Sequence, residues 1–508
     1  MVRKADMLED LRFVADTIEQ VHPDPFVRCG GRITFYQRLR AIGQALPAEM
    51  SSAEFAIELG RVTAIIGDGH TAIHARDAEP EETAFPIEFT VIESDLVVTA
   101  IHADHAHALG ERLASVHDIP VGTLLQSLSD FVGVDNEIAL ATRLASCLRS
   151  PSWVQRLTGS TDLTRSLALK FNSSDTPSLV LSPGRADVDL ATPPTMIEKP
   201  DFGRATMGWA PMPDAADTIY LRVRVCADYR EAYELMAELG TLSTADPFLD
   251  RRFGDRANPD GTIDPALILE VPSASAMLGD LCDHAQATGA KRVIVDVRGN
   301  PGGQSIISRL LVLAWFGYDA AVRASPAHTL PRISARLQMR WPHQPQLLDG
   351  QYDFTELDEV EAALRDGAAS NELQFGLNAC PSIANQLTTR GRETWWKPAS
   401  IFVLTDTQTA SSGYSIATDL RRVGATLVGT PSSQSGNAFG DYTLHQLPNS
   451  GASLGVSFKM FRYWPDDPER GHILRPDIPL TYETFRNHRF DPNTTVTLAT
   501  QPQDTPAQ

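Results

Sequence analysis

Apolar residues in the first eighty positions recur every three or four residues, as on one buried face of a helix. One such run covers residues 8–21, and a second begins after Ser52. The second run ends at Gly67-Asp68-Gly69, which is a strong stop signal for a helix. We therefore predict a helical N-terminal cap over residues 1–80, which closes with an extended segment from His70 to His74.

From residue 85 the pattern changes to strands. Residues 87–91 and 96–100 are rich in aliphatic and β-branched side chains, and Glu93-Ser94-Asp95 between them suits a hairpin turn. A helical run follows near residues 122–132. This stretch predicts a small β-rich module with a helix over residues 81–160.

A third pattern, strand then glycine turn then helix, repeats from residue 275 onward, after an alternating strand at residues 219–225. The predicted strands are 293–295, 401–404 and 426–429, and the predicted helices are 305–316 and 411–423. Short apolar strands that alternate with helices favour an α/β core with substantial parallel sheet. We assign this core to residues 161–485, with polar surface insertions near 239–268 and 320–395, the second holding Trp395-Trp396 as packing residues.

Composition narrows the class of protein. The chain has 508 residues, about three domains by length, and 42% apolar residues, enough for a core. Its net charge of −20 argues against nucleic acid or anionic lipid as the main partner. The charged N-terminus precedes no apolar signal region, and no stretch reaches the roughly 20 apolar residues that cross a bilayer. We expect a soluble cytoplasmic protein that does not bind a membrane, although removal of a signal would leave the same appearance.

The C-terminal residues, the cysteines and a cluster of histidines do not predict a functional site. Residues 486–508, rich in Thr, Pro and Gln toward the end, are predicted to be a disordered tail. The five cysteines are scattered, without a C-x-x-C pair, and are interpreted as reduced core thiols. His102, His105 and His107 fit no standard zinc spacing and are interpreted as a polar loop. No metal and no cofactor are predicted.

Ser411 is the first candidate for chemistry, because it follows a predicted buried strand and stands where a helix begins. Its hydroxyl would lie at a sheet edge, where pockets form in α/β proteins. The helix N-terminus supplies free backbone N–H groups, so the N–H of Ser412 could form half of an oxyanion hole. Thr409, Ser411 and Ser412 could equally serve as ordinary helix caps.

Gly302 and Gly303 form the second candidate, in the turn that follows the strand at 293–295. Adjacent glycines let a backbone approach a ligand closely, and the N–H of one of them could be the second oxyanion donor. A tight strand-to-helix turn or a phosphate-binding loop would show the same two glycines in the sequence. No Lys-Ser/Thr follows the glycines, so a P-loop is not supported. Asp296 and Arg298 are interpreted as structural ions at the strand end.

Three motifs in order resemble the tail-specific, or C-terminal-processing, serine peptidases: residues 293–303, residues 409–412 and Arg475-Pro476-Asp477-Ile478. His22-Pro23 and residues 67–71 look like the helical region of the tricorn-core and chlamydial-protease-like branch. The likeness covers most of residues 5–485. It implies a ClpP/crotonase-like α/β core, a degenerate PDZ-like module around residues 109–121, and peptide or protein substrates, with assembly into a homo-oligomer left open.

The resemblance also directs the search for a base, which a serine hydroxyl needs for activation. The processing branch uses a lysine in a turn, but the corresponding turn here, residues 432–437, has none, and Lys459 lies in a strand-like run. The other branch uses Ser, His and Glu. His70 then matches the base, with His74 as a fallback.

Glu469 is the best match to the acid of that triad, and Asp466 and Asp467 remain alternatives because the local alignment is loose. The leading hypothesis is a serine peptidase that needs no cofactor, with Gly302 or Gly303 and Ser412 as oxyanion donors. A binding protein that keeps the fold without activity, or an esterase or cyclase that uses the same serine, remains open.

Overall fold

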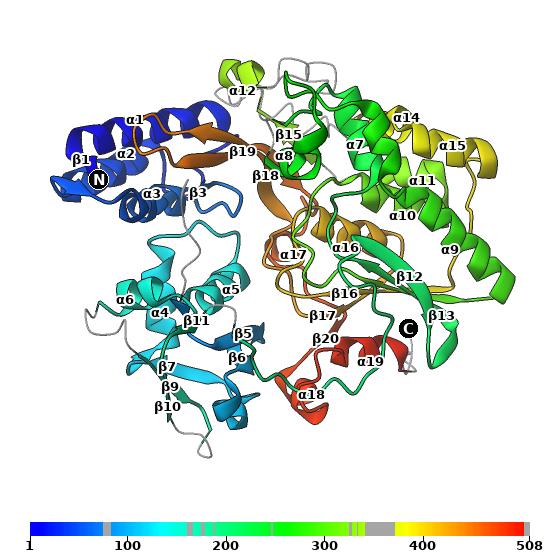
Figure 1. Ribbon diagram of the computed structural model, residues 1–508, viewed down its shortest axis with the longest axis horizontal. Coiled ribbons are helices and arrows are strands. Elements are labelled where there is room, and N and C mark those ends of the chain that lie inside the picture. The colour runs from blue at the N-terminus through cyan, green and yellow to red at the C-terminus, as the bar shows by residue number, and fades with distance from the viewer. Residues whose placement is uncertain are drawn as a thin grey trace.

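The computed structural model describes residues 1–74, 83–159, 166–173, 178–185, 188–244, 247–324, 328–332, 334–340 and 371–501. Three N-terminal helices and a β-rich module lie on one side of the molecule, and the α/β core lies on the other (Figure 1). The long hairpin of β18 (Asn437–Gln446) and β19 (Ser453–Arg462) reaches from the core to the N-terminal helices. Among the described residues, no helix is long and apolar enough to cross a membrane.

A six-stranded sheet forms the centre of the core. Its strands, in spatial order, are β12 (Met207–Met212), β13 (Ala215–Val223), β14 (Arg292–Asp296), β16 (Ser400–Thr405), β17 (Thr426–Gly429) and β20 (Ile478–Pro479). From β13 to β20 every neighbouring pair is parallel, and β12 is antiparallel to β13. The predicted parallel sheet is confirmed.

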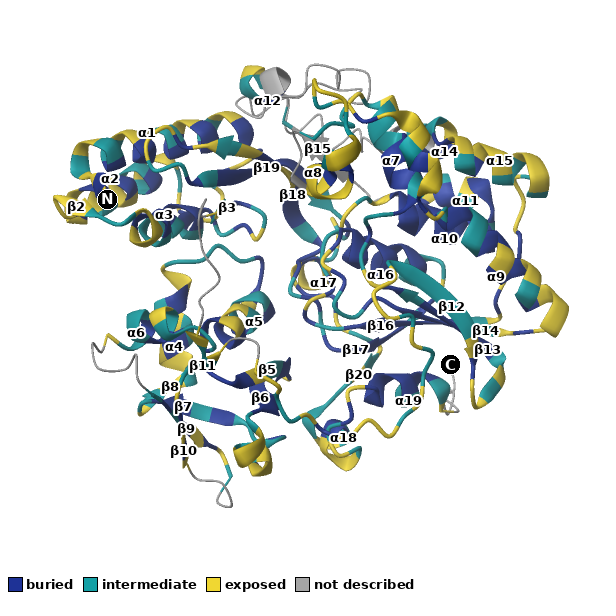
Figure 2. Ribbon diagram, in the orientation of Figure 1, coloured by how far each residue is buried: buried dark blue, intermediate teal, exposed yellow. Residues whose placement is uncertain are grey.

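Helices cover both faces of this sheet, which explains why its strands are apolar on both sides. The central strands are buried, whereas the edge strand β12 is mostly half-buried (Figure 2), and Val293, Ile294 and Val295 of β14 have no exposed surface. The helices of the core are α7 (Arg230–Glu238), α9 (Ala274–Thr288), α10 (Ile306–Phe316), α11 (Tyr318–Arg323), α14 (Asn371–Ala379), α15 (Pro381–Arg390), α16 (Ser412–Arg422) and α19 (Thr494–Thr500).

The N-terminal helices are α1 (Lys4–Val21), α2 (Arg32–Ala45) and α3 (Ser52–Ile66). Their apolar faces pack together and against Leu454, Val456 and Phe458 of β19, forming one hydrophobic cluster. The short strand β3 (Ala72–His74) pairs antiparallel with β19. The two ends of the chain therefore build one layer, which places His70, just before β3, beside the C-terminal hairpin.

The β-rich module is larger than the sequence predicts. Its elements are β5 (Ile87–Ile92), β6 (Asp95–Ile101), β7 (Leu113–Val116), β8 (Ile119–Pro120), α4 (Val121–Ser129), α5 (Glu137–Cys147), α6 (Pro151–Thr158), β9 (Leu167–Phe171) and β10 (Ser178–Leu181). β9 and β10 extend the β7–β8 sheet, and their apolar residues belong to the module's core. The predicted boundary at residue 160 is too early, because these strands close the core from beyond it.

The two expected surface insertions contain helices, and the second also contains the strand β15 (His328–Pro331), which pairs with β19. The first contains α8 (Pro247–Phe253), whose Leu249 and Phe253 pack on Tyr233 of α7. In the second, α14 and α15 join the main core, with Trp395 and Trp396 buried there. Residues 371–396 are thus part of the helical layer rather than a surface insertion, and residues 341–370 lie outside the described part.

The predicted disordered tail is wrong for residues 486–501. The helix α18 (Tyr482–Asn487) precedes α19, which packs against the sheet through buried Val496 and Ala499. A polar composition concealed two apolar positions that the open face of the sheet buries. Residues 502–508 lie outside the described part.

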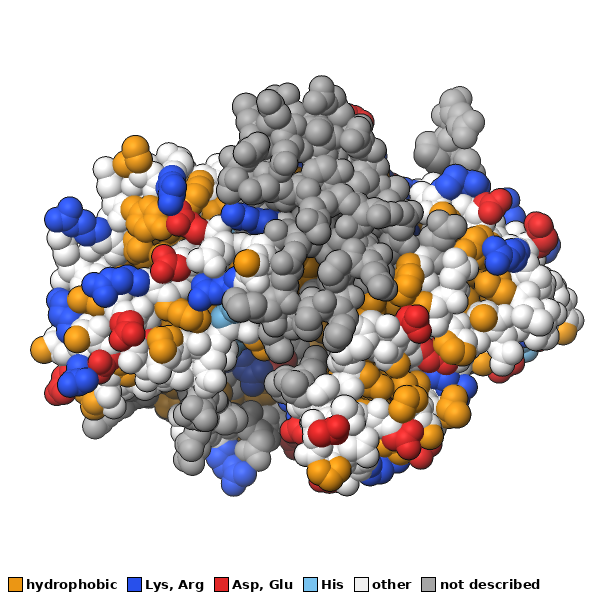
Figure 3. Space-filling view, turned by 90° about the horizontal axis from the view of Figure 1, so that it is seen from above, with side chains coloured by type: hydrophobic (Ala, Val, Ile, Leu, Met, Phe, Trp, Pro, Cys, Tyr) orange, Lys and Arg blue, Asp and Glu red, His pale blue; other side chains and the backbone are white. Residues whose placement is uncertain are grey.

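The remaining short elements are β1 (Val2–Arg3), β2 (Glu49–Met50), β4 (Thr83–Ala84), β11 (Gly184–Arg185), β15 (His328–Pro331), α12 (Ala335–Arg340), α17 (Pro468–His472) and four-residue or longer 3₁₀ turns at Ala103–Ala108 and Pro265–Glu270. All five cysteines are buried and free, as predicted. On the described part of the face in Figure 3, basic side chains are interspersed with acidic ones rather than gathered in a patch.

Candidate active site

Ser411 has a backbone conformation that ordinary residues avoid. Its φ of 51° and ψ of −123° lie in a region that is strained for a residue with a Cβ. It stands at the N-cap position of α16, yet its side chain makes no capping hydrogen bond. The simple capping role is therefore not realised. A strained serine between a strand and a helix is the arrangement that exposes a nucleophilic hydroxyl.

Gln434 holds Ser411 in this conformation. The backbone N–H of Ser411 donates a hydrogen bond to Oε1 of Gln434. Ser432 braces the same loop, because its hydroxyl donates to the carbonyl of Thr409 and accepts from the N–H of Gln434 at 2.9 Å. Residues 430–436 thus connect the serine turn to the start of β18.

The same loop contains no lysine. Gln434 lies in the turn of residues 432–437, which corresponds to the turn that holds the lysine in the resemblance described above. Lys459 is buried in β19, and its Nζ forms an ion pair with Asp441 at 2.6 Å.

Gly302 and Gly303 press against Ser411 and Ser412, and both need to be glycine. A Cβ on Gly302, at φ 111°, would lie 2.4 Å from Cβ of Ser411. A Cβ on Gly303, at φ 131°, would lie 2.1 Å from the carbonyl oxygen of Cys226. The hydroxyl of Ser412 donates to the carbonyl of Gly303 at 2.6 Å. The glycine turn and the start of α16 therefore form one surface.

The backbone donors of this surface are not equivalent. The N–H of Gly302 already donates to Oδ1 of Asn300 at 2.9 Å. No partner for the N–H of Gly303 occurs among the described residues. Ser412 is the first residue of α16, where a backbone N–H has no partner within the helix. Gly303 and Ser412 are thus better placed than Gly302 to bind an oxyanion.

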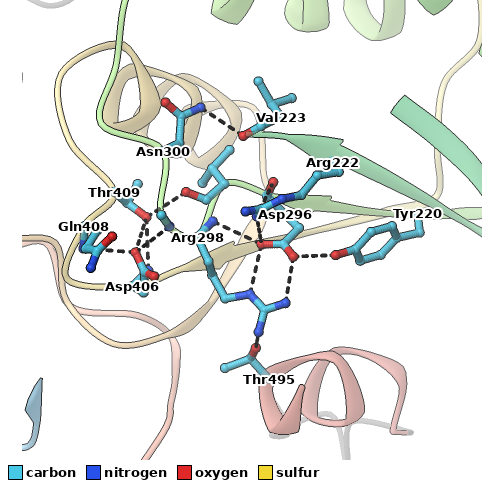
Figure 4. Close-up of polar contacts among 12 residues, drawn as sticks. Tyr220, Arg222, Val223, Asp296, Arg298, Asn300, Asp406, Gln408, Thr409 and Thr495 are labelled. Carbon is cyan, nitrogen blue, oxygen red and sulfur yellow. Dashed lines mark hydrogen bonds and ion pairs between the residues drawn. The ribbon is translucent and has the colours of Figure 1, made fainter. Parts of the chain in front are cut away.

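A buried ion cluster supports the glycine turn from below (Figure 4). Asp296, at the end of β14, accepts from Arg298 at 2.7 and 2.9 Å, from Arg222 at 2.7 Å and from the hydroxyl of Tyr220. Burial raises the pKa of Asp296, but the two guanidinium groups outweigh it and hold this pKa well below its usual range. Arg298 also donates to Thr495 of α19 at 2.9 Å. Asp296 and Arg298 have the structural role that the sequence predicts.

Asp406 ties the glycine turn to the serine turn. Its Oδ1 accepts from the N–H of Gly299 at 2.9 Å, and the hydroxyl of Thr409 donates to the carbonyl of Val297 at 3.0 Å (Figure 4). β14 and β16 are neighbouring parallel strands, so the turns that follow them lie at the same edge of the sheet.

His70 stands in the turn between α3 and β3, and Asp68 shapes that turn. The Asp68 carboxylate accepts from the N–H of His70 at 3.0 Å, from Thr71 and from the hydroxyl of Ser457 at 2.6 Å. Nε2 of His22 lies 3.4 Å from it. Burial raises the pKa of Asp68, but His22, His70 and Ser457 outweigh burial and hold the pKa well below its usual range.

The imidazole of His70 is half-buried. Nδ1 is buried and has no hydrogen-bond partner among the described residues. Cε1 lies 3.7 Å from the position of a Cβ on Gly440 of β18. His74, the fallback base, is exposed and stacks on Tyr442 with ring centroids 6.3 Å apart.

Asp135 joins the turn of His70 to the loop that holds Ser411. Its Oδ1 accepts from the N–H of Gly69 at 2.9 Å, and its Oδ2 accepts from the N–H of Ser435 at 3.3 Å. Burial and the nearby charge of Asp68 raise the pKa of Asp135, whereas the charge of His70 lowers it. The His70 turn and the Gln434–Ser435 loop thus converge on one buried carboxylate.

Comparison with known proteins identifies the core. Residues 268–480, which include the glycine turn and Ser411, match the model of peptidase family S41. The chain carries a peptidase family S41 domain. No curated protein sequence matches this chain significantly.

Solved structures show that the fold around the S41 domain is also known. The chain is similar to mature CPAF (TM-score 0.56, 14% identity, covering 98% of this chain and 96% of that one). It is also similar to mature CPAF complexed with lactacystin (TM-score 0.55, 15% identity) and to a serine-to-alanine mutant of CPAF (TM-score 0.57, 14% identity), with 98% of both chains covered in each case. At these identities the likeness establishes the fold alone, over nearly the whole length.

The three candidate acids lie in α17 or just before it. Glu469 is exposed on α17, and none of the described contacts joins Glu469, Asp466 or Asp467 to His70. Asp467 instead caps α17 by accepting from the N–H of Arg470 at 2.9 Å. The helix itself is close to the site, because the hydroxyl of Ser435 donates to the carbonyl of His472 at 2.7 Å.

Sequence reasoning missed Gln434 and Asp135. Gln434 was noticed only as the absence of a lysine, although a buried polar residue opposite a strained serine is a structural signal. Asp135 precedes α5 and looks like an ordinary helix start. Nothing in its neighbourhood predicts a hydrogen bond with Ser435, 300 residues away. No group of residues in the described part of the S41 chain could hold a metal ion.

Proposed function

We propose that this chain is a serine peptidase of family S41 that hydrolyses peptide bonds through an acyl-enzyme on Ser411. The observation that carries the proposal is the strained, uncapped Ser411 with Gly302 pressed against its Cβ. A helix cap has no need of this strain, whereas a nucleophile gains an exposed hydroxyl beside free backbone donors.

In the proposed reaction, Ser411 attacks the acyl carbon while Nε2 of His70 takes the hydroxyl proton. The oxyanion accepts hydrogen bonds from the N–H groups of Gly303 and Ser412, and Gly302 provides the space beside the serine. His70 then gives the proton to the leaving amine. In the second half, water gives a proton to Nε2 of His70 and attacks the acyl carbon; the bond to Oγ of Ser411 breaks, Oγ takes the proton back, and the carboxylic acid product leaves, so neither a metal nor an organic cofactor enters the scheme.

The base needs support from negative charge, since it becomes an imidazolium during the reaction. Asp68 and Asp135 both interact electrostatically with His70 and are buried beside it. Glu469 remains our candidate for the acid that orients the ring, with Asp466 and Asp467 as alternatives, because α17 contacts the loop at Ser435. Movement of the Glu469 side chain toward His70 is part of this proposal.

We infer that the substrate is an extended peptide. The chain would cleave it either internally, as an endopeptidase, or near its C-terminus, as a processing peptidase. Among the described strands β18 pairs with β19 alone, so it is an edge strand of this described sheet, and it begins directly after the Gln434–Ser435 loop. An extended peptide could add to such an edge by backbone hydrogen bonds.

The test is labelling of the full chain with a fluorophosphonate, followed by peptide mapping. We expect labelling at Ser411, loss of labelling and of peptide hydrolysis in Ser411→Ala, and retention of both in Ser433→Ala. Ser433 is a suitable control because it lies in the neighbouring loop and its hydroxyl has no hydrogen bond among the described contacts.

Two other functions use the same fold. Folded wild-type protein that never labels would favour a binding protein, for which the unoccupied lysine position is the supporting observation. Labelling at Ser411 without hydrolysis of any peptide would favour an esterase or a cyclase. Both outcomes would overturn the peptidase proposal.

A further inference from the structure

The segment between α4 and α5 of the β-rich module, residues 130–136, packs directly against α3 and the turn that carries His70. A Cβ on Gly133 would lie 2.7 Å from the carbonyl oxygen of Asp68 and 2.9 Å from that of Thr63. A Cβ on Gly60 of α3 would lie 2.6 Å from the carbonyl oxygen of Phe131. Backbone packs directly on backbone here, so a shift of this segment must move the His70 turn.

Arg28 strengthens the same junction from the loop after α1. Its guanidinium donates to the carbonyl oxygens of Val134 at 3.2 Å and of Asp135 at 3.3 Å, and also to that of Gly67. The guanidinium thus binds the module segment and the end of α3 at once. Arg28 thus connects three parts of the chain close to His70: the loop after α1, the end of α3 and the module.

Asp135 extends this junction to the nucleophile. Its side chain is 5% exposed, and its two oxygens accept from Gly69 on one side and Ser435 on the other. Gly69 immediately precedes His70, and Ser435 immediately follows Gln434, which holds the N–H of Ser411. The Asp135 carboxylate therefore joins the turn of His70 to the loop of Gln434, and the carbonyl oxygen of Asp135 adds a second link, because it accepts from the hydroxyl of Ser435 at 3.3 Å.

We propose that Asp135 is a positioning residue, through which the β-rich module sets the alignment of His70 with Ser411. The proposal rests on the proposed function of these two residues. Asp135 touches neither the substrate nor the reacting atoms; it acts through the backbones of Gly69 and Ser435. The module is then part of the frame of the active site, and not only a platform for substrate.

The test measures the inactivation of the full chain by a fluorophosphonate, separated into the maximal rate kinact and the half-saturation concentration KI. We expect kinact to fall about 10-fold in Asp135→Asn, which keeps one acceptor oxygen, and about 100-fold in Asp135→Ala, the loss typical of small misplacements in active sites. KI should stay unchanged, because the binding surface for the reagent is intact.

Asp491→Asn is the matched control. Asp491 is also fully buried and accepts from three backbone N–H groups, those of Met196, Ile197 and Asn493, at 2.6–2.9 Å. None of these partners belongs to the His70 or Ser411 turns. Thermal unfolding should therefore reveal a loss of stability in this variant, whereas kinact should remain that of wild type.

A second variant keeps the test decisive if Asp135→Ala fails to fold. A Cβ on the exposed Gly69 would lie 3.2 Å from Oδ1 of Asp135, so Gly69→Ala disturbs the same contact from its other side. Kinact of the double variant with Asp135→Asn should fall by less than the product of the single effects, as for two residues in contact. Multiplicative effects, or wild-type kinact in Asp135→Asn and Gly69→Ala, would overturn the positioning role.

The outcomes also separate the two proposals. A folded wild-type chain that the reagent does not label removes the proposed function and the positioning role with it. A wild-type chain labelled at Ser411, with variants that react equally fast or change only in KI, removes the positioning role and leaves the peptidase proposal standing.

Discussion

The backbone N–H of Ser411 donates a hydrogen bond to Oε1 of Gln434, which lies 23 residues later in the chain. Gln434 is 6% exposed and stands in the turn of residues 432–437, which contains no lysine. The residue thus holds the serine backbone instead of activating its hydroxyl. This difference is why the proposed base comes from the N-terminal layer, at His70.

Replacement of Gln434 by alanine should slow catalysis. The change leaves the N–H of Ser411 without its acceptor in a half-buried site, at a cost of about 1–3 kcal/mol. If the strained serine relaxes, kcat should fall about 10- to 100-fold. Peptide hydrolysis measures the loss. Gln408→Ala, an exposed glutamine in the preceding turn, is the control and should keep the wild-type rate; equal rates in both variants would contradict the role of Gln434.

Replacement of Gly302 by alanine should abolish the reaction with a smaller effect on folding. The added methyl group would meet Cβ of Ser411 at 2.4 Å and must displace the nucleophile. Gly424→Ala isolates the backbone strain, because Gly424 also has a positive φ, 99°, but open space around its Cβ position. Thermal unfolding should show a loss of about 1–2 kcal/mol in Gly424→Ala from the left-handed backbone and a larger loss in Gly302→Ala. Fluorophosphonate labelling should be lost only in Gly302→Ala.

Glu469→Gln tests the proposed acid. If Glu469 orients His70, kcat should fall by roughly 100- to 10,000-fold, in the range seen when a triad carboxylate becomes an amide. Asp467→Asn tests the alternative acid in the same way: an asparagine oxygen can still cap α17, so stability should change little, and kcat should fall only if Asp467 rather than Glu469 orients the ring. A wild-type rate in Glu469→Gln would contradict this role, and would indicate that the buried Asp68 and Asp135 stabilise the imidazolium of His70 instead.

Asp296 should make stability depend on pH in acid. Because the folded state lowers its pKa below the unfolded value of about 3.9, its contribution is complete above that pH and disappears as the pH falls through the folded pKa. Asp296→Asn should cost about 3–5 kcal/mol at neutral pH, since two guanidinium groups lose their partner.

Urea unfolding of wild type and Asp296→Asn at pH 7 and at pH 3 measures this effect. The difference in unfolding free energy between the two proteins should shrink in acid, as wild type approaches protonation of the same carboxylate. A difference that stays constant from pH 7 downward would indicate that the ion cluster under the glycine turn adds no pH-dependent stability.

The sequence by itself predicted the elements that are contiguous in the chain. The apolar strands at 293–295 and 401–404, the glycine turn between strand and helix, and the helix after Ser411 all follow from local periodicity and turn chemistry. Their order also indicated the parallel sheet, because strands joined through helices pair in parallel. Parallel pairing of β14 and β16 brings their following turns to one edge, whereas the sequence associated Ser411 with Gly302 through the resemblance to the serine peptidases.

Tertiary structure alone decided how the distant segments meet. The hydrogen bonds of Asp135 to Gly69 and Ser435, and the use of the Gly302 N–H by Asn300, depend on how three packed layers fit together. Packing between layers also explains why α19 is a helix rather than a disordered tail. Its two apolar residues, Val496 and Ala499, become buried only because they pack on a face of the sheet. Local sequence sets which groups are available, but packing between layers determines which of them come within hydrogen-bonding distance.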